Sequence, residues 1–199
     1  ARLPIQEATA SMIVDIGGGT SEVAVISMGG IVTSRSSRIA GDEMNQDIID
    51  FARDHFNLLL GERTAEKIKI ELGAAMAQPV PRERPMRGRD LVTGLPKEVV
   101  INDEQVRLAL GKSILAVVTA VRETLEETPP ELVADIMERG VVLAGGGALM
   151  KDLDKLISQE TQTKVYLAED PLTAVVRGAG VVLEELEALE NVLLSSALK

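Results

Sequence analysis

One short stretch of the chain combines residue types that could hold a phosphate: VDIGGGTSEVAV, residues 14–25. Asp15 comes at the end of an apolar run, and Gly17, Gly18, Gly19 and Thr20 follow it closely. Glycines leave backbone amides open to an anion, Thr20 adds a hydroxyl donor, and the Asp15 carboxylate could hold a metal-bound water. The alternative is a plain glycine hairpin with a solvated aspartate, and the glycine triplet alone does not decide between them.

A second glycine triplet stands in LAGGGALM, residues 143–150, between a predicted buried strand and a predicted helix start. It comprises Gly145, Gly146 and Gly147, followed by Ala148. The free N–H groups of a helix N-terminus favour an anionic ligand, whereas the structural alternative is a tight strand-to-helix turn. If the two preceding strands are neighbours, we expect both triplets to open into the same crevice.

Three further features have structural explanations. Glu66 and Lys69 lie three residues apart on one face of a predicted helix, where an ion pair on a solvated surface is the ordinary interpretation. The tripeptide GKS at residues 111–113 is not a P-loop, because Val106 stands where that motif needs glycine and the segment lies inside a helical pattern. His55 has no partners that would make it chemically active.

Composition limits the possible functions. The 199 residues are 45% hydrophobic but only 2% aromatic, which predicts an α/β core of Val, Ile, Leu, Ala and Met. The net charge of −10 argues against nucleic acid as a partner, and the lack of cysteine excludes disulfides and thiolate metal sites. Since no apolar run approaches ~18 residues and the first residues lack signal-peptide features, we expect neither a membrane span nor secretion. The start at Ala1 suggests a processed chain or an excised piece.

Hydrophobic periodicity predicts the elements that position these residues. Strands are expected at 11–16 and 21–28, with a more exposed one at 31–39. Helices follow at 40–60, ended by Gly61, and at 62–75, before a proline- and arginine-rich hairpin of 82–91 and 97–102. A long helix over 102–128 carries an apolar stripe of Val106, Leu110, Ile114, Val117, Val121 and Leu125. The remaining elements are a helix at 130–140, a strand at 140–144, a helix at 151–161, a strand at 164–168, and a helix from 171 with Pro171 in its first turn.

This order predicts an α/β fold with a mixed sheet flanked by helices. Composition changes near Gly41 and near Asn102, which suggests an insertion. We therefore expect one α/β domain of residues 1–41 plus 103–199, with a smaller α+β subdomain of residues 42–102 inserted into it.

Several sequence blocks, in this order, resemble the MreB family of bacterial actins over essentially the whole chain. They are DIGGGTSEVAVIS, RIAGDEMNQDI, TAEKIKIELG, MRGRDLVTGLP, ERGVVLAGGGALMKDLDKLI and VYLAEDPLTAVVRGAG. The chain looks like the C-terminal half of such a protein, with 1–41 plus 103–199 as subdomain IIA and 42–102 as subdomain IIB. The resemblance implies the ribonuclease-H-like fold of actin-like ATPases. It also implies binding of ATP or ADP with Mg²⁺ in an interdomain cleft, and filaments that direct cell-wall elongation and rod cell shape.

The resemblance also implies roles for individual residues. Gly17, Gly18, Gly19 and Thr20 would meet the nucleotide phosphates, and Asp15 would meet the hydration shell of the magnesium ion. The second triplet, Gly145, Gly146 and Gly147 with Ala148, would lie beside the base, ribose and α-phosphate. The segment Glu66, Lys67, Ile68 and Lys69 resembles the helix that contacts the nucleoside, which replaces the ion-pair interpretation of Glu66 and Lys69.

The family's first phosphate loop, catalytic acid and membrane-touching segments belong to a first domain that these 199 residues do not contain. We therefore expect no catalytic residue, negligible ATPase activity and weak nucleotide affinity in the chain alone. The implied partners are other filament subunits, the membrane adaptor RodZ and the elongation machinery, at the cytoplasmic face of the inner membrane, which the chain itself touches only indirectly. An adaptor-docking module without nucleotide turnover is the alternative function. A sugar kinase or chaperone ATPase of the same superfamily is disfavoured by the blocks outside the glycine loops.

Overall fold

The apolar segments around the first glycine triplet form an antiparallel meander. In the computed structural model, which describes residues 1–184, β1 (Ser11–Ile16) pairs with β2 (Ser21–Ser27), and β2 pairs with β3 (Gly30–Ser37). Two strands from the C-terminal part, β7 (Val141–Ala144) and β8 (Val165–Leu167), add parallel to β1 in the order β3-β2-β1-β7-β8. The predicted mixed sheet is confirmed.

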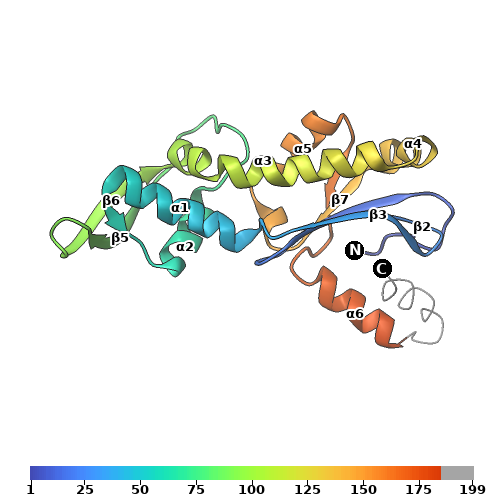
Figure 1. The fold of residues 1–199 in the computed structure, drawn as a ribbon, viewed down its shortest axis with the longest axis horizontal. Helices are drawn as coiled ribbons and strands as arrows, with labels where there is room; N and C mark the ends of the chain where they lie inside the picture. Colours follow the sequence, from blue (N-terminus) through green and yellow to red (C-terminus); the bar gives the residue numbers. More distant parts are fainter. Residues whose placement is uncertain (185–199) are drawn as a thin grey trace.

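The long helix α3 (Asp103–Glu127) packs against one face of this sheet (Figure 1). Its predicted stripe is buried apart from Leu125, which is partly buried against the core. An Asn102–Gln105 capping box starts the helix, because each side chain accepts a hydrogen bond from the other residue's backbone N–H. Figure 1 shows α5 (Leu153–Thr161) on the same side as α3, α4 (Pro130–Arg139) near its far end, and α6 (Ala174–Glu184) on the opposite side.

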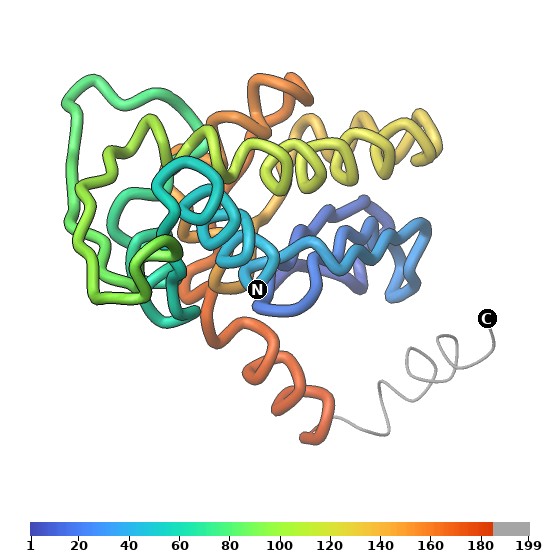
Figure 2. The backbone as a smooth tube through the Cα atoms, turned by 60° about the vertical axis from the view of Figure 1, so that its left-hand side comes forward, coloured from blue at the N-terminus to red at the C-terminus, as the bar shows by residue number. Residues whose placement is uncertain are grey.

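A second, three-stranded sheet lies at the other end of the molecule. It comprises β4 (Leu58–Leu59), β5 (Glu83–Asp90) and β6 (Pro96–Asn102), and α1 (Gly41–Phe56) and α2 (Glu62–Leu72) lie beside it. Figure 2 shows this cyan-to-green segment on one side and the blue strands β1–β3 on the other. One continuous hydrophobic core includes Met44 and Met86 of this region together with Val14 and Leu143 of the larger sheet. The division into subdomains at residues 41 and 102 stays a prediction.

The core has the predicted composition. Every buried hydrophobic side chain of residues 1–184 is Ala, Val, Ile, Leu or Met. Aliphatic side chains pack densely without the polar handles of Tyr or Trp, so the interior needs few buried hydrogen bonds. No helix of the described part is long and apolar enough to cross a membrane.

Several predicted boundaries are wrong. The helix predicted at 62–75 ends at Leu72, with Gly73 as its C-cap. α1 ends at Phe56 rather than Gly61, because Asn57 adopts a left-handed conformation (φ 50°) and the chain then enters β4, which the sequence did not indicate. Residues 147–149 form a single 3₁₀ turn instead of the start of an α-helix, and α5 begins only at Leu153. Residues 171–173 are a turn, so Pro171 precedes α6 rather than lying in its first turn; the predicted continuation over residues 185–196 lies outside the described residues.

Candidate functional site

The two glycine triplets start side by side. β1 and β7 are parallel neighbours, with Asp15 paired to Ala144, so both strands end at the same edge of the sheet. The turns that follow open into one cleft of about 710 Å³, whose opposite wall comes from α2. The shared crevice that the sequence suggested is therefore confirmed, and its place beyond the carboxyl ends of strands is where α/β sheets bind ligands.

Close contact between the two turns explains the glycines of the second triplet. A Cβ on Gly145 would lie 2.3 Å from the Ile16 carbonyl oxygen, and Gly145 also has φ +82°. A Cβ on Gly147 would lie 2.2 Å from Cγ2 of the buried Ile16. Side chains are excluded at both positions by the backbone and core of β1. Because residues 147–149 form only a 3₁₀ turn, the helix-dipole argument made from the sequence does not hold here.

The first triplet is held in place by its own hairpin and by the start of α1. The Gly17 amide donates to the Thr20 carbonyl (2.9 Å), while the Gly41 and Asp42 amides donate to the carbonyls of Gly17 (3.0 Å) and Gly18 (2.8 Å). These bonds occupy the carbonyls of the turn. Within residues 1–184 no hydrogen bond engages the amides of Gly18 and Gly19, which leaves two donors for a ligand.

One face of α2 forms the facing wall. The helical period brings together the cleft residues Glu66, Lys69, Ile70 and Gly73. The Lys69 ammonium donates a hydrogen bond to the Gly41 carbonyl (2.7 Å), and burial lowers the pKa of Lys69, an effect that Glu66 and Asp42 oppose. No Glu66–Lys69 salt bridge forms among the described residues, so the ion pair expected from spacing alone is replaced by this contact.

Asp15 supplies a carboxylate at the mouth of the cleft. Burial raises the pKa of Asp15, and the neighbouring charge of Glu22 raises it further. Among the described residues no cationic side chain pairs with Asp15 to lower its pKa. This fits a position beside a bound cation. In the described part of the chain, no group of three or more acidic, histidine or cysteine side chains is placed so that it could hold a metal ion.

The predicted site residues divide into two groups. Those that line the cleft are Asp15, Gly17, Gly18, Glu66, Lys69, Gly145, Gly146 and Gly147. Gly19 and Thr20 complete the hairpin without lining the cleft, and Ala148 is buried beneath the second turn. Lys67 points to solvent with its side chain 72% exposed, and Ile68 is buried in the core.

The sequence did not single out the other cleft residues as ligand contacts, although all of them except Arg82 lie within the blocks that resemble the family. These other cleft residues are Gly41, Asp42, Met44, Ile70, Gly73, Arg82, Leu149, Met150, Lys151, Pro171, Leu172 and Val175. For Ile70 and Gly73 the helical period from Glu66 and Lys69 was an available signal. Arg82 arrives from the loop before β5, where its guanidinium donates to the Glu71 carbonyl (2.9 Å) at the end of α2. Only the tertiary structure brings such residues to the site.

Two contacts join α2's end to the loop after the second triplet. The Ala75 amide donates to the Lys151 carbonyl (2.8 Å), and the Gln78 side-chain amide donates to the Asp152 carboxylate (2.7 Å). Together with the Lys69–Gly41 bond they connect the two walls at opposite ends of the cleft. The width of the cleft therefore depends on a few hydrogen bonds between sequence-distant segments.

The mixed sheet, its flanking helices and the cleft at the strand ends define an actin-like domain. The MreB/Mbl protein family profile matches residues 1–191, and the chain belongs to that family. It is 50% identical over 187 residues to the cell shape-determining protein MreB of Escherichia coli K12, covering 94% of this chain and 54% of that protein. It is 44% identical over 189 residues to Mbl of Bacillus subtilis 168, covering 95% of this chain and 57% of that protein. The chain thus spans about half the length of these curated relatives.

Solved structures agree with this assignment. The crystal structure of Spiroplasma citri MreB5 bound to ADP superposes with a TM-score of 0.89 at 37% identity, over 96% of this chain and 57% of that one. The same protein bound to AMPPNP also gives 0.89 at 37% identity, over 95% and 57%. The MamK double helical filament, at 21% identity and a TM-score of 0.74 over 88% of this chain and 54% of that one, shares the fold.

Gly145 tests whether the contact between the turns is essential. We expect Gly145→Ala to lower the free energy of unfolding by about 1–3 kcal/mol, since it combines a left-handed backbone with a clash against the Ile16 carbonyl. Gly146→Ala is the matched control, because its Cβ would lie 3.4 Å from the exposed Leu172 side chain. Urea denaturation measures both variants, and equal losses would contradict the close-contact explanation.

Asp15 tests the electrostatics of the cleft. Because the pKa of Asp15 is raised in the folded state, the protonated side chain favours folding and the ionised one opposes it. The stability that protonated Asp15 contributes is therefore lost as pH rises from about 4 through the folded-state pKa. Without ligand, Asp15→Asn should therefore unfold at a higher temperature than the parent at pH 7, and the difference should vanish below pH 4. Thermal unfolding across pH measures this, with Asp54→Asn, on the surface of α1, as the control. A destabilised Asp15→Asn protein at pH 7 would refute the assignment.

Proposed function

We propose that the cleft is one side of a site for Mg²⁺ and an adenine nucleotide, and that the chain is the second half of a filament-forming bacterial actin. The observation that carries this proposal is the meeting of the two glycine turns opposite the α2 face of Glu66 and Lys69. The ADP- and AMPPNP-bound MreB5 structures, whose fold this chain shares, support the choice of ligand.

The groups of the cleft suggest a division of labour. The unengaged Gly18 amide lines the cleft and suits the terminal phosphates, because amides in a tight turn bind anions without a desolvated counter-charge. The Gly19 amide and the Thr20 hydroxyl, next along the same hairpin, would join it when the nucleotide is bound. Asp15 suits the water shell of Mg²⁺, which would neutralise phosphate charge when bound. The nucleoside would contact the rest of the cleft lining, which includes the second triplet Gly145–Gly147 and, on α2, Glu66 and Lys69.

Hydrolysis needs groups on both sides of the nucleotide, because phosphoryl transfer depends on positioning and charge stabilisation around the whole phosphate. This cleft is one side of the proposed nucleotide site, and among the described residues Asp15, Asp42 and Glu66 are its only carboxylates. We infer binding with weak affinity and negligible turnover by the chain alone.

For the whole protein we propose nucleotide-dependent filaments at the cytoplasmic face of the inner membrane that direct cell-wall elongation, with RodZ as the membrane adaptor. Support comes from membership of a family whose curated relatives are named cell shape-determining proteins. A filament also needs complementary ends, and the charge distribution of this chain offers them.

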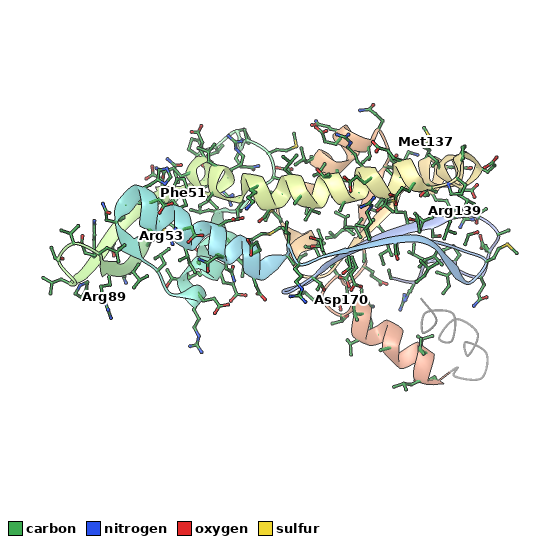
Figure 3. The ribbon with its side chains drawn as sticks, in the orientation of Figure 1. Phe51, Arg53, Arg89, Met137, Arg139 and Asp170 are labelled. Carbon is green, nitrogen blue, oxygen red and sulfur yellow. The ribbon has the colours of Figure 1, made fainter. Side chains whose placement is uncertain are left out.

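The two ends of the long axis differ in charge. The segment 82–97 of the β5–β6 hairpin has five basic and two acidic residues, and its tip exposes Leu91, Val92 and Leu95. The segment 123–138, covering the end of α3 and most of α4, has six acidic residues and no basic ones. Figure 3 places Arg89 at one extremity and Met137 at the other. A head-to-tail contact between copies would pair these opposite charges and would propagate into a filament.

Nucleotide binding is tested by calorimetric titration of the chain with Mg-ADP. We expect weak binding that Lys69→Ala reduces about 10-fold or more, the loss of one charge-assisted hydrogen-bonding group. Lys67→Ala is the control, because Lys67 is on the same helix but faces solvent. Equal effects of the two variants, or turnover of Mg-ATP comparable to a two-domain relative, would contradict the proposal.

End-to-end association is tested by sedimentation velocity at high protein concentration and low salt. We expect Arg87→Glu with Arg89→Glu to shift the chain to slower-sedimenting species, because the change places like charges at the contact. Adding Glu131→Arg and Glu138→Arg should restore association. Arg63→Glu, on the exposed side of α2, is the control, and a loss of association as large as that of the hairpin variant would show that net charge alone is responsible.

A further inference from the structure

Arg82 lies in the wall of the cleft but has no part in the nucleotide contacts proposed above. It is the only arginine among the described residues that line the cleft, and its side chain is 34% exposed. It comes directly before β5, outside both glycine turns and α2. A charged group held this far out of solvent needs polar partners, and the partners of Arg82 lie on two different helices.

The first partner is the last turn of α2. The Arg82 guanidinium donates through Nη1 to the Glu71 carbonyl (2.9 Å) and through Nη2 to the Leu72 carbonyl (3.4 Å). The last carbonyls of a helix have no acceptor role within the helix, and a cation beside them is favoured by the helix dipole. Because α2 has only 11 residues, it depends on such outside contacts for its stability.

The second partner is the start of α3. The Asp103 amide donates to the Arg82 carbonyl (3.0 Å), and Nε of Arg82 lies 3.8 Å from Oδ2 of Asp103. Asp103 is only 7% exposed, and within the described part of the chain neither Nε nor Oδ2 has a hydrogen-bond partner. Two buried atoms of opposite charge that face each other attract strongly, because little solvent screens them. Arg82 therefore joins the end of α2 to the beginning of α3.

This junction lies where it can set the position of one cleft wall. The α2 residues that line the cleft are Glu66, Lys69, Ile70 and Gly73. Lys69 is bonded to the Gly41 carbonyl beside the first glycine turn, and Arg82 holds the other end of the helix. Loss of the Arg82 contacts would free the last turn of α2 while leaving both glycine turns in place.

We propose that Arg82 is a positioning residue, which fixes the nucleoside side of the cleft by holding the last turn of α2 against the start of α3. Each of its three guanidinium nitrogens already faces a carbonyl or a carboxylate, which favours this role over direct contact with a ligand. The inference rests on the proposed function, because it assigns the nucleoside to the α2 wall and the phosphates to the glycine turns.

Arg84 offers a matched control. It is the other arginine at the start of β5 that contacts Glu71, but its Nε donates to the Glu71 carboxylate (2.9 Å) rather than to the helix backbone. Its side chain is 50% exposed and does not line the cleft. An exposed ion pair of this kind contributes little, so Arg84→Ala should leave α2 in place.

The test compares the binding of Mg-ADP with that of Mg-pyrophosphate by calorimetry. Arg82→Ala is combined with Asp103→Asn, so that no buried carboxylate is left without its cation, and is compared with Asp103→Asn alone. We expect the Kd for Mg-ADP to rise about 5-fold or more, while that for Mg-pyrophosphate, which needs only the glycine turns, stays unchanged. Arg82→Lys, which keeps the charge and one donor, should recover part of the loss, and Arg84→Ala should change neither Kd.

An equal loss of affinity for both ligands, or unchanged affinity for Mg-ADP, would overturn the proposal. Hydrogen exchange without any ligand provides a second measurement. We expect the Arg82→Ala, Asp103→Asn protein to exchange several-fold faster than Asp103→Asn in the peptide covering residues 66–73, with no change at residues 15–20. Unchanged exchange at residues 66–73 would overturn the role of Arg82 alone, whereas a parent chain that binds no Mg-ADP would contradict the proposed function as well.

Discussion

The site depends on one contact, the close approach of two glycine turns at the ends of the parallel strands β1 and β7. The pairing of Asp15 with Ala144 fixes where both turns begin. The distance of 2.3 Å between a Cβ on Gly145 and the Ile16 carbonyl shows that the turns are packed as tightly as backbone allows. Glycine is thus required on the β7 side by sterics, and the amides of the β1 side are left free to face a ligand.

The same contact places the facing wall. The start of α1 is bound to the first turn through the Gly41 and Asp42 amides, and Lys69 of α2 reaches back to the Gly41 carbonyl. Each wall of the cleft is therefore connected to the glycine turns by hydrogen bonds to backbone carbonyls. The site gains a half-buried cation in Lys69 and a carboxylate in Asp15 whose pKa is raised by burial and by the neighbouring Glu22. Both features suit a ligand that brings phosphates together with a divalent cation.

Much of this arrangement was predictable from local sequence. Alternating and helical periodicity identified the strands around Asp15 and the stripe from Val106 to Val121, because burial of one face imposes those periods. The sequence did not predict that β1 and β7 are neighbours; it predicted only a shared crevice if they were, because 125 residues separate Asp15 from residue 140. Arg82 belongs to none of the sequence blocks that resemble the family, and tertiary packing alone brings it to the cleft. Asn57 ended α1 early because a left-handed cap depends on the strand that follows, which was too short to leave a periodic signal.

The central claim is that a nucleotide contacts both glycine turns and α2 at once. Hydrogen exchange of the chain with and without saturating Mg-ADP, followed by mass spectrometry, tests it most directly. We expect slower exchange in all three peptides together, covering residues 15–20, 66–73 and 145–148, with no change in α3. Protection confined to one of the three segments, or absent from all of them, would contradict it.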